Sequence, residues 1–210
     1  MSTTQRDPEP GGVSEDMMAG DPMTQFARWM ADALASGMPE PTAMVLSTIT
    51  AEGRPRARTV LLKAHDQAGF TFYSNRTSRK GGELAANPAA CLLFPWYGIQ
   101  RQVIVEGRVR ELSQAQSEPY FRSRPRGSQI GAWASRQSTV IASRAVLEDR
   151  VAELERRWPD PGQVPMPDFW GGYLLEPDAV EFWQAGVYRL HDRLRYRRAD
   201  GGWAVDRLSP

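Results

Sequence analysis

The stretch Gln100–Glu111 reads QRQVIVEGRVRE and has the most regular strand pattern in the chain. Its valines alternate at Val103, Val105 and Val109, and Gln, Glu and Arg fill most of the other positions. A period of two sends the two sets to opposite faces of a strand. We therefore expect an antiparallel strand with one face against a core and one polar face.

Similar short runs lie on both sides of this stretch and are separated by turn residues. The predicted strands cover residues 43–50, 56–63, 70–74, 90–94, 100–111, 173–175, 180–184, 193–197 and 203–208, the last two joined by a hairpin turn at residues 200–202. Predicted helices run from residues 21–22 to near 37 and over 78–87, 113–122 and 143–158, and the proline-rich stretch 159–167 is expected to be a loop. This pattern predicts a mainly β, α+β fold, a closed antiparallel barrel with helical decoration.

The composition predicts one domain. With 210 residues, 41% of them hydrophobic, the chain can fill one substantial core. Residues 1–20 are rich in Ser, Thr, Pro, Gly, Asp and Glu, and we expect them to form a disordered tail. Order is expected to begin at Asp21, a good N-cap before a proline, and residues 21–210 are expected to form a single domain.

Charge and cysteine content exclude several classes of protein. The 26 basic and 25 acidic residues leave a net charge of +1, which argues against a general binder of nucleic acid or membrane surfaces. No apolar stretch approaches the ~18 residues of a membrane span, and no signal-peptide core is present. The single Cys91 suits a reducing compartment, and with two histidines we expect no metal site. We expect a cytoplasmic protein.

Short clusters that mix Arg or Lys with hydroxyl groups are the candidate binding residues. They are Arg58 and Lys63, then Ser78-Arg79-Lys80, then Tyr120 with Arg124 and Ser128, then Gln137-Ser138, and finally Arg189 to Arg193. Cationic side chains and hydroxyls are common phosphate ligands, and a helix beginning at Ser78 adds free backbone N–H groups. The same clusters also fit a solvated surface, with Ser78 only a cap and Lys63 only an exposed strand end.

The segment Arg189-Leu190-His191-Asp192-Arg193 holds one of the two histidines between two arginines. If it is a strand, Arg189, His191 and Arg193 share one face. Three such groups are costly to bury without partners, so we expect them to face an anionic ligand or water.

Ten motifs together resemble the pyridoxamine 5′-phosphate oxidase family, in order and at the family's spacing from about residue 21 to the end. They are Arg58-Thr59-Val60-Leu61-Leu62-Lys63, Ser78-Arg79-Lys80, Phe94-Pro95-Trp96, Arg101-Gln102-Val103, Ser123-Arg124-Pro125-Arg126, Ser128 to Trp133, Phe169-Trp170-Gly171-Gly172, Glu181-Phe182-Trp183-Gln184, Arg189 to Arg193 and Asp206-Arg207-Leu208.

The resemblance implies an FMN-binding split β-barrel that forms a homodimer with FMN at the subunit interface. It further implies oxidation of pyridoxamine or pyridoxine 5′-phosphate to pyridoxal 5′-phosphate, after which dioxygen reoxidises the flavin and is released as hydrogen peroxide. Two phosphate-bearing ligands would account for the basic clusters.

The resemblance also implies the site residues. The FMN set would be Arg58, Thr59, Val60, Leu61, Leu62, Lys63, Tyr73, Ser74, Arg79, Lys80, Gln102, Gln137, Ser138, Trp183 and Arg193. The substrate set would be Lys63, Tyr120, Arg124 and Ser128 around the phosphate, with Arg189 and His191 as catalytic residues at the pyridine ring. Because hydride must leave toward flavin N5, orientation is the main catalytic contribution expected of the protein.

Strict alternation puts Arg58 and Lys63 on opposite faces of one strand, which conflicts with a shared pocket. Either a bulge intervenes, or the two residues serve different ligands or subunits. Trp96, Trp133 and Trp170 are expected in the core or an interface rather than in catalysis.

Some residues depart from the family pattern. Arg6 has no matching tyrosine for the Arg-x-x-Tyr motif of the family's N-terminal segment, and Ala185, Val187 and Tyr188 replace smaller or polar residues before Arg189. Two alternatives therefore stay open. One is a related FMN oxidase of another ring, such as a phenazine precursor, for which phosphate ligands would be unnecessary. The other is a non-enzymatic flavin or pyridoxal-phosphate carrier, which would not need both Arg189 and His191.

Overall fold

A nine-stranded antiparallel sheet forms the body of the protein, for which the computed structural model describes residues 12–210. Strand β6 (Arg101–Glu111) lies at the centre of the order β2-β1-β5-β6-β7-β4-β3, and β8 and β9 extend from β7. The other strands are β1 (Ala43–Ile49), β2 (Pro55–Leu61), β3 (Ala64–Asp66), β4 (Gly69–Asn75), β5 (Ala89–Trp96), β7 (Trp170–Gln184), β8 (Asp192–Ala199) and β9 (Gly202–Arg207). Arg6 lies outside the described residues.

The sheet curls but does not close as the predicted full barrel. Strands β2 and β3 are the two ends of the hydrogen-bonded order. They are adjacent in sequence, so the short link Leu62-Lys63 brings the ends together. In that link the N–H of Leu62 donates to Thr42 O and that of Lys63 to Thr71 O, both at 2.9 Å. The barrel is therefore joined at this corner by the link rather than by a ladder.

The alternation predicted for β6 is confirmed. Val103 and Val105 are fully buried and Val109 nearly so, whereas Glu106, Arg108 and the residues at its end are exposed. The buried face joins a single apolar core with residues from most of the other strands.

Strand β7 is one continuous strand of 15 residues, where the sequence predicts two short ones. The two predicted strands leave out residues 176–179, which include Pro177, a residue without the N–H that a ladder requires. In the structure the register of β6 against β7 shifts between Glu106 and Gly107, and Gly107 lies opposite Pro177. A Cβ at position 107 would lie 2.1 Å from the carbonyl oxygen of Glu176, so only glycine allows this approach.

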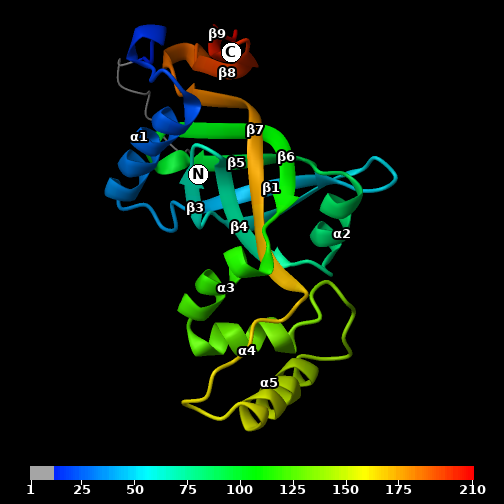
Figure 1. Ribbon diagram of the computed structural model, residues 1–210. Helices are drawn as coiled ribbons and strands as arrows, with labels where there is room; N and C mark the ends of the chain where they lie inside the picture. The colour runs from blue at the N-terminus through cyan, green and yellow to red at the C-terminus, as the bar shows by residue number, and fades with distance from the viewer. Residues whose placement is uncertain (1–11) are drawn as a thin grey trace, which may run out of the picture.

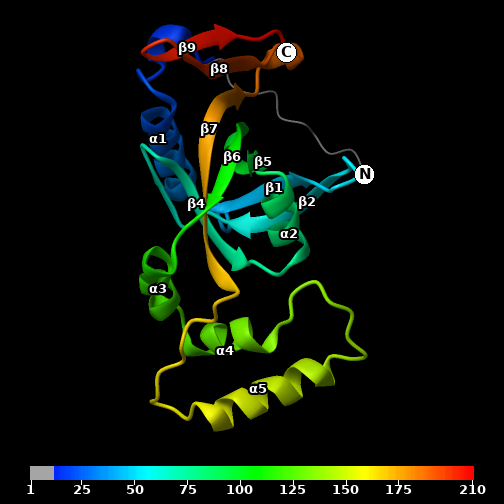
Figure 2. The ribbon, with the colours of Figure 1, turned by 45° about the vertical axis from the view of Figure 1, so that its right-hand side comes forward.

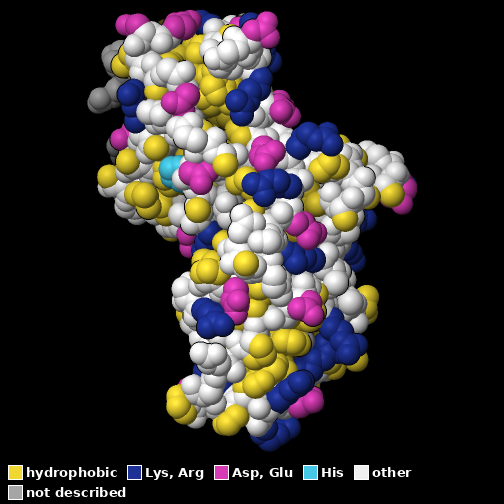
Figure 3. Space-filling view, viewed as in Figure 1, with side chains coloured by type: hydrophobic (Ala, Val, Ile, Leu, Met, Phe, Trp, Pro, Cys, Tyr) yellow, Lys and Arg dark blue, Asp and Glu magenta, His cyan; other side chains and the backbone are white. Residues whose placement is uncertain are grey.

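Helices α3 (Gln114–Ser123), α4 (Arg126–Ala134) and α5 (Ala145–Arg157) form a layer below the sheet at the lower end of β7, as Figures 1 and 2 show. Figure 3 shows charged side chains on the outer surface of this layer. Helix α4 was not predicted, because Gly127 and Gly131 lower its helix propensity. No helix within residues 12–210 has the length and apolar character to cross a bilayer.

The predicted helix caps are confirmed. Helix α1 (Pro22–Ala35) begins after Asp21, whose carboxylate accepts hydrogen bonds from the N–H groups of Met23 and Thr24. Helix α2 (Arg79–Ala86) begins after Ser78, whose hydroxyl accepts from Gly81 N–H. The remaining short helices are η1 (Glu15–Met17), η2 (Tyr97–Ile99) and η3 (Val187–Arg189).

Residues 12–20 differ from the predicted disordered tail, because they pack beside β8 and β9 (Figure 2). Arg207 on β9 forms an ion pair with Glu15 at 2.8 Å, and its Nη2 donates to Val13 O. Ala19 is buried, and its carbonyl accepts a 2.6 Å hydrogen bond from Tyr196. Contacts with a distant part of the chain therefore order a segment whose own composition is that of a tail.

Phe26 on α1 is expected to be a main support of the core. Its ring is fully buried and lies within 5.0 Å of the ring centroids of His65, Phe70 and Phe94. Phe26→Ala should lower the free energy of unfolding, measured by urea denaturation, by about 3–5 kcal/mol, because the surrounding core cannot fully fill the space that the ring leaves. Leu34→Ala on the exposed side of the same helix should change it by less than about 0.5 kcal/mol. Equal losses in the two variants would contradict this packing.

Candidate functional site

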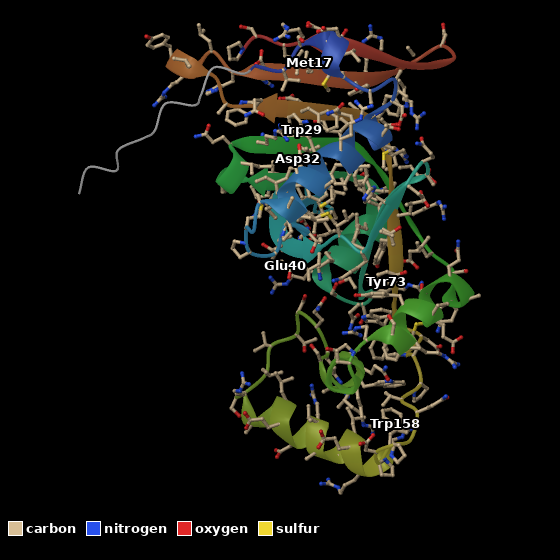
Figure 4. The ribbon with its side chains drawn as sticks, turned by 90° about the vertical axis from the view of Figure 1, so that its left-hand side faces the viewer. Met17, Trp29, Asp32, Glu40, Tyr73 and Trp158 are labelled. Atoms are coloured by element: carbon tan, nitrogen blue, oxygen red, sulfur yellow. The ribbon has the colours of Figure 1, made fainter. Side chains whose placement is uncertain are left out.

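A cavity of about 820 Å³ lies where the sheet meets the helical layer. Figure 4 shows Tyr73 at this boundary, between the sheet and the helices below it. Strands β2 and β4, the start of α2, the α3–α4 corner and the start of β7 contribute the lining. The lining residues are Arg58, Thr59, Val60, Leu61, Lys63, Tyr73, Ser74, Asn75, Lys80, Tyr120, Arg124, Pro125, Ser128, Gly131, Ala132, Ser135, Gln137 and Trp170.

The lining is strongly cationic although the chain is nearly neutral. Arg58, Lys63, Lys80 and Arg124 all contribute to it, and among residues 12–210 no Asp or Glu does. Four cations that share one cavity create a positive potential, which favours anionic ligands. The structure thus brings together the predicted phosphate-binding residues of both sets.

Arg124 is a cation of the lining with a buried nitrogen that has no partner among residues 12–210. It caps the C-terminal end of α3, and its guanidinium lies 4.8 Å from the ring centroid of Trp170. Its Nη1 is buried and has no hydrogen-bond partner among the described residues. Burial lowers the pKa of Arg124, and Tyr120 only partly opposes this. A buried donor without an acceptor costs free energy, which a bound anion would recover.

Three stacked aromatic rings form one wall of the cavity. The Tyr73 ring centroid lies 4.1 Å from that of Tyr120 and 5.3 Å from that of Trp170, with interplanar angles of 26° and 13°. Trp170 was expected in the core or an interface, and it is only 6% exposed. It is nonetheless part of the wall, where it also supports Arg124.

Lys80 lies at the start of α2 among neutral acceptors. Its Nζ donates to Gln137 Oε1 at 2.6 Å and to Ser74 Oγ at 3.1 Å. Burial and the nearby Arg58 lower the pKa of Lys80, while Glu83 opposes them. Because none of the groups that it contacts is a carboxylate, the charge of Lys80 is left for a ligand.

Arg79 and Ser138 line a smaller adjoining cavity of about 300 Å³, together with Arg58 and Lys80. The Arg79 backbone N–H donates to Ser138 Oγ at 3.3 Å. The first turn of α2 and the loop after α4 therefore meet at this smaller cavity.

Arg58 and Lys63 were predicted on opposite faces of one strand, but the strand ends before Lys63. Strand β2 stops at Leu61, so the alternation that separates the two residues does not extend to Lys63. Both residues line the same cavity. Leu62, which was predicted in the FMN set, instead has a buried side chain in the core and is not among the lining residues.

The other predicted residues form a second cluster at the far end of β7. Trp183 on β7 is opposite Gln102 on β6 and Arg193 on β8, so the three are cross-strand neighbours. The His191 ring centroid lies 4.6 Å from that of Trp183. Arg193 forms an ion pair with Glu181 at 2.8 Å. Trp170 and Trp183 are 13 residues apart on one strand, which corresponds to roughly 40 Å when extended.

The predicted alternation of Arg189, His191 and Arg193 on one strand face is wrong. Strand β8 begins only at Asp192, and Arg189 and His191 lie in the tight turn before it. Arg189 is exposed and has φ 63°. A Cβ at Gly186 would lie 1.9 Å from Leu190 O, so the turn requires glycine there. The Gly186 N–H donates to His191 Nδ1 at 3.1 Å, which orients the imidazole.

The prediction missed several lining residues. These are Asn75, Pro125, Gly131, Ala132, Ser135 and, as a wall residue, Trp170. Four of them, Pro125, Gly131, Ala132 and Ser135, lie in or next to helix α4, which was not predicted. Gly131 and Ala132 have no functional group that could have identified them as binding residues. Asn75 follows the predicted Ser74 at the end of β4, so its place in the lining could have been inferred from that of its neighbour.

Two family models match most of the chain. A family model described as pyridoxamine 5′-phosphate oxidase matches residues 30–157, and one described as pyridoxine 5′-phosphate oxidase C-terminal dimerisation region matches residues 170–210. The pyridoxine/pyridoxamine 5′-phosphate oxidase of Salinispora arenicola is 55% identical over 95% of this chain and 90% of its own. That of Burkholderia vietnamiensis is 54% identical over 94% and 93%.

Solved structures show the same fold. PhzG from Burkholderia lata 383, in complex with tetrahydrophenazine-1-carboxylic acid, has a TM-score of 0.87 at 33% identity and covers 93% of this chain and 95% of its own. A pyridoxamine 5′-phosphate oxidase-related, FMN-binding protein from Nostoc punctiforme has a TM-score of 0.71 at 16% identity, over 88% of this chain and 97% of its own. The curled sheet with its helical layer is thus a split barrel.

Inorganic phosphate is expected to stabilise the ligand-free protein through Arg124. Compared with sodium chloride at equal ionic strength, phosphate should raise the melting temperature by about 2–4 °C per kcal/mol of binding free energy. Arg124→Ala should lose the part of this rise that binding at Arg124 contributes, while the site around Lys80 keeps its own part. Arg122→Ala is the matched control, because Arg122 is exposed and pairs with Glu118. An undiminished rise in Arg124→Ala would show that the anion binds elsewhere.

Proposed function

The chain belongs to the pyridoxamine 5′-phosphate oxidase family, and from this membership we infer that it oxidises pyridoxamine 5′-phosphate or pyridoxine 5′-phosphate to pyridoxal 5′-phosphate. The observation that carries the inference is the unpartnered Nη1 of Arg124, buried in a cationic cavity. Tyr120 and Ser128 line the same cavity and supply hydroxyl groups beside this guanidinium. A phosphate monoester satisfies all three.

FMN is the proposed cofactor, and the donor set fits it. A second anion site around Lys80, Arg79 and Ser138 suits the FMN phosphate, because it combines two cations with the start of α2. The backbone and side chains of residues 58–61 would lie along the flavin edge. When bound, FMN accepts the hydride equivalent of the substrate and passes two electrons to dioxygen, which yields hydrogen peroxide.

The protein's own contribution is orientation. Arg124, Tyr120 and Ser128 would hold the substrate phosphate, and the Tyr73–Tyr120–Trp170 wall limits the space beside it. Fixing the phosphate at one end leaves the ring few positions in the cavity. Such restriction brings the reacting carbon close to its acceptor and accounts for a large part of a rate enhancement.

A second copy of the chain is proposed to complete the site. Gln102, Trp183 and Arg193 are the remaining predicted FMN residues, and Arg189 and His191 the predicted catalytic ones, yet all lie at the other end of β7. One chain cannot bring both ends of an extended strand to the same ligand. The match of residues 170–210 to a dimerisation region supports a homodimer in which each site combines the cavity of one copy with this cluster of the other.

In that arrangement Arg189 and His191 would reach the pyridine ring from the partner. The Gly186 N–H occupies His191 Nδ1, which leaves Nε2 to meet the amine or hydroxyl of the substrate. Arg193 would lie nearer the flavin.

We place the reaction in the cytoplasm, where a half-buried thiol such as Cys91 stays reduced.

Oxidation of another ring is the second candidate, because PhzG is similar and its structure holds a tetrahydrophenazine carboxylic acid. Arg124, Tyr120 and Ser128 favour a phosphate over such a ring, since a substrate without phosphate leaves them unsatisfied. A non-enzymatic carrier would have no use for Arg189 and His191.

Oxygen consumption by the FMN-loaded protein tests the proposal. Pyridoxine 5′-phosphate or pyridoxamine 5′-phosphate should support oxygen uptake with one hydrogen peroxide formed per turnover, whereas unphosphorylated pyridoxine should not at the same concentration. Arg124→Ala should raise the KM for the phosphorylated substrate roughly 10- to 100-fold, equivalent to ~1.5–3 kcal/mol for a charged hydrogen bond. Its FMN affinity should change little. A protein that takes up FMN but oxidises neither phosphorylated vitamer would refute the function.

A further inference from the structure

We propose that Glu83 is a positioning residue that holds Arg58 in its orientation toward the cofactor. The inference rests on the proposed function, since it takes FMN as the ligand that Arg58 meets. Glu83 is on α2 and does not line the large cavity. Its effect on the ligand is therefore exerted through Arg58.

The carboxylate of Glu83 is buried and fully used. Its side chain is 7% exposed, and Oε2 accepts from Arg58 Nη2 at 2.9 Å and from Thr48 Oγ1 at 2.5 Å. Oε1 accepts from Arg56 Nη1 at 2.9 Å. Burial would raise the pKa of Glu83, but the hydrogen bonds from Thr48, Arg56 and Arg58 outweigh it and lower the pKa. The group is thus an anion near neutral pH.

These contacts hold the guanidinium of Arg58 on the side that faces away from the cavity. Besides Glu83, its Nη1 donates to Leu46 O at 3.2 Å and to Thr48 Oγ1 at 2.5 Å. Arg58 stands on β2, an end strand of the sheet whose residues are mostly exposed. A long side chain at such a position has many rotamers unless its end is held. Glu83 and Thr48 therefore hold the guanidinium of Arg58 in one position, with its remaining edge toward the cavity.

Glu83 also compensates charge in this corner. Arg56, Arg58, Arg79 and Lys80 line the smaller cavity, and Glu83 is in ion-pair contact with two of them. Arg56 is 47% exposed and Arg58 only 21%, so the pair with Arg58 is the better shielded from water. Without the carboxylate, Arg58 and Lys80 would repel each other with less opposition, and Arg58 would be free to turn away from the cavity.

A double-mutant cycle tests the proposal. The full-length protein is stripped of flavin and FMN is titrated into wild type, Glu83→Gln, Arg58→Ala and the double variant, with the dissociation constant read from flavin fluorescence. Glu83→Gln keeps the shape but replaces one acceptor oxygen with a donor. It should weaken FMN roughly 10-fold in the wild-type background and less than about 2-fold when Arg58 is already alanine.

The controls separate positioning from general destabilisation. Glu176→Gln breaks the exposed pair with Arg110 and should leave the FMN dissociation constant unchanged. Should Glu83→Gln fail to fold by circular dichroism, Thr48→Val replaces it in the same cycle. This variant removes the hydroxyl that joins Glu83 to Arg58 and should show the same dependence on Arg58.

An equal loss of FMN affinity with and without Arg58 would overturn the proposal, because a purely structural effect does not depend on that side chain. No loss at all in Glu83→Gln would overturn it as well. If wild type itself does not bind FMN, the proposed function fails instead, so the two failures are distinguishable.

Discussion

The close approach of Gly107 to the carbonyl of Glu176 is the contact on which the rest of the structure depends. It lets β7 continue past Pro177, so that one strand pairs with β4 at its start, with β6 along most of its length and with β8 at its end. The start of β7 supplies Trp170 to the cavity, and its end supplies Trp183 to the second cluster. A side chain at position 107 would break the strand that sets the distance between them.

Charge is the second organising constraint. The fold collects Arg58, Lys63, Lys80 and Arg124 around one cavity, where their repulsion opposes folding. Hydrogen bonds to neutral acceptors stabilise the charge of Lys80, and the carboxylate of Glu83 partly compensates the charge of Arg58. Arg124 is left with a buried nitrogen that nothing in residues 12–210 satisfies. The protein thus gives up some stability at a position where a bound phosphate would restore it.

Local signals in the sequence were sufficient for β6, for the caps of α1 and α2 and for the positions of most strands along the chain. They failed where distant parts of the chain decide the outcome. Strand β7 was predicted as two strands, because the glycine that accommodates Pro177 lies on β6 and is distant in sequence. Residues 12–20 were predicted to be a disordered tail, but they are held by contacts with Arg207. The turn at Gly186 replaces the expected alternation of Arg189 and His191, because two successive residues adopt positive φ. The family resemblance named all four cations of the large cavity, yet no single-chain pattern could separate them from the cluster at Trp183.

The central claim is that each site combines the Arg124 cavity of one copy with the Arg189 turn of another. Dimers that contain one Arg124→Ala chain and one Arg189→Ala chain, purified through two different tags, test it directly by oxygen uptake with pyridoxine 5′-phosphate. In such a dimer one site carries both substitutions and the other carries neither, so the account predicts about half of the wild-type activity from a two-fold symmetric pair. Activity no higher than that of the two single-variant homodimers would contradict the account, because it would mean that each chain builds its own site.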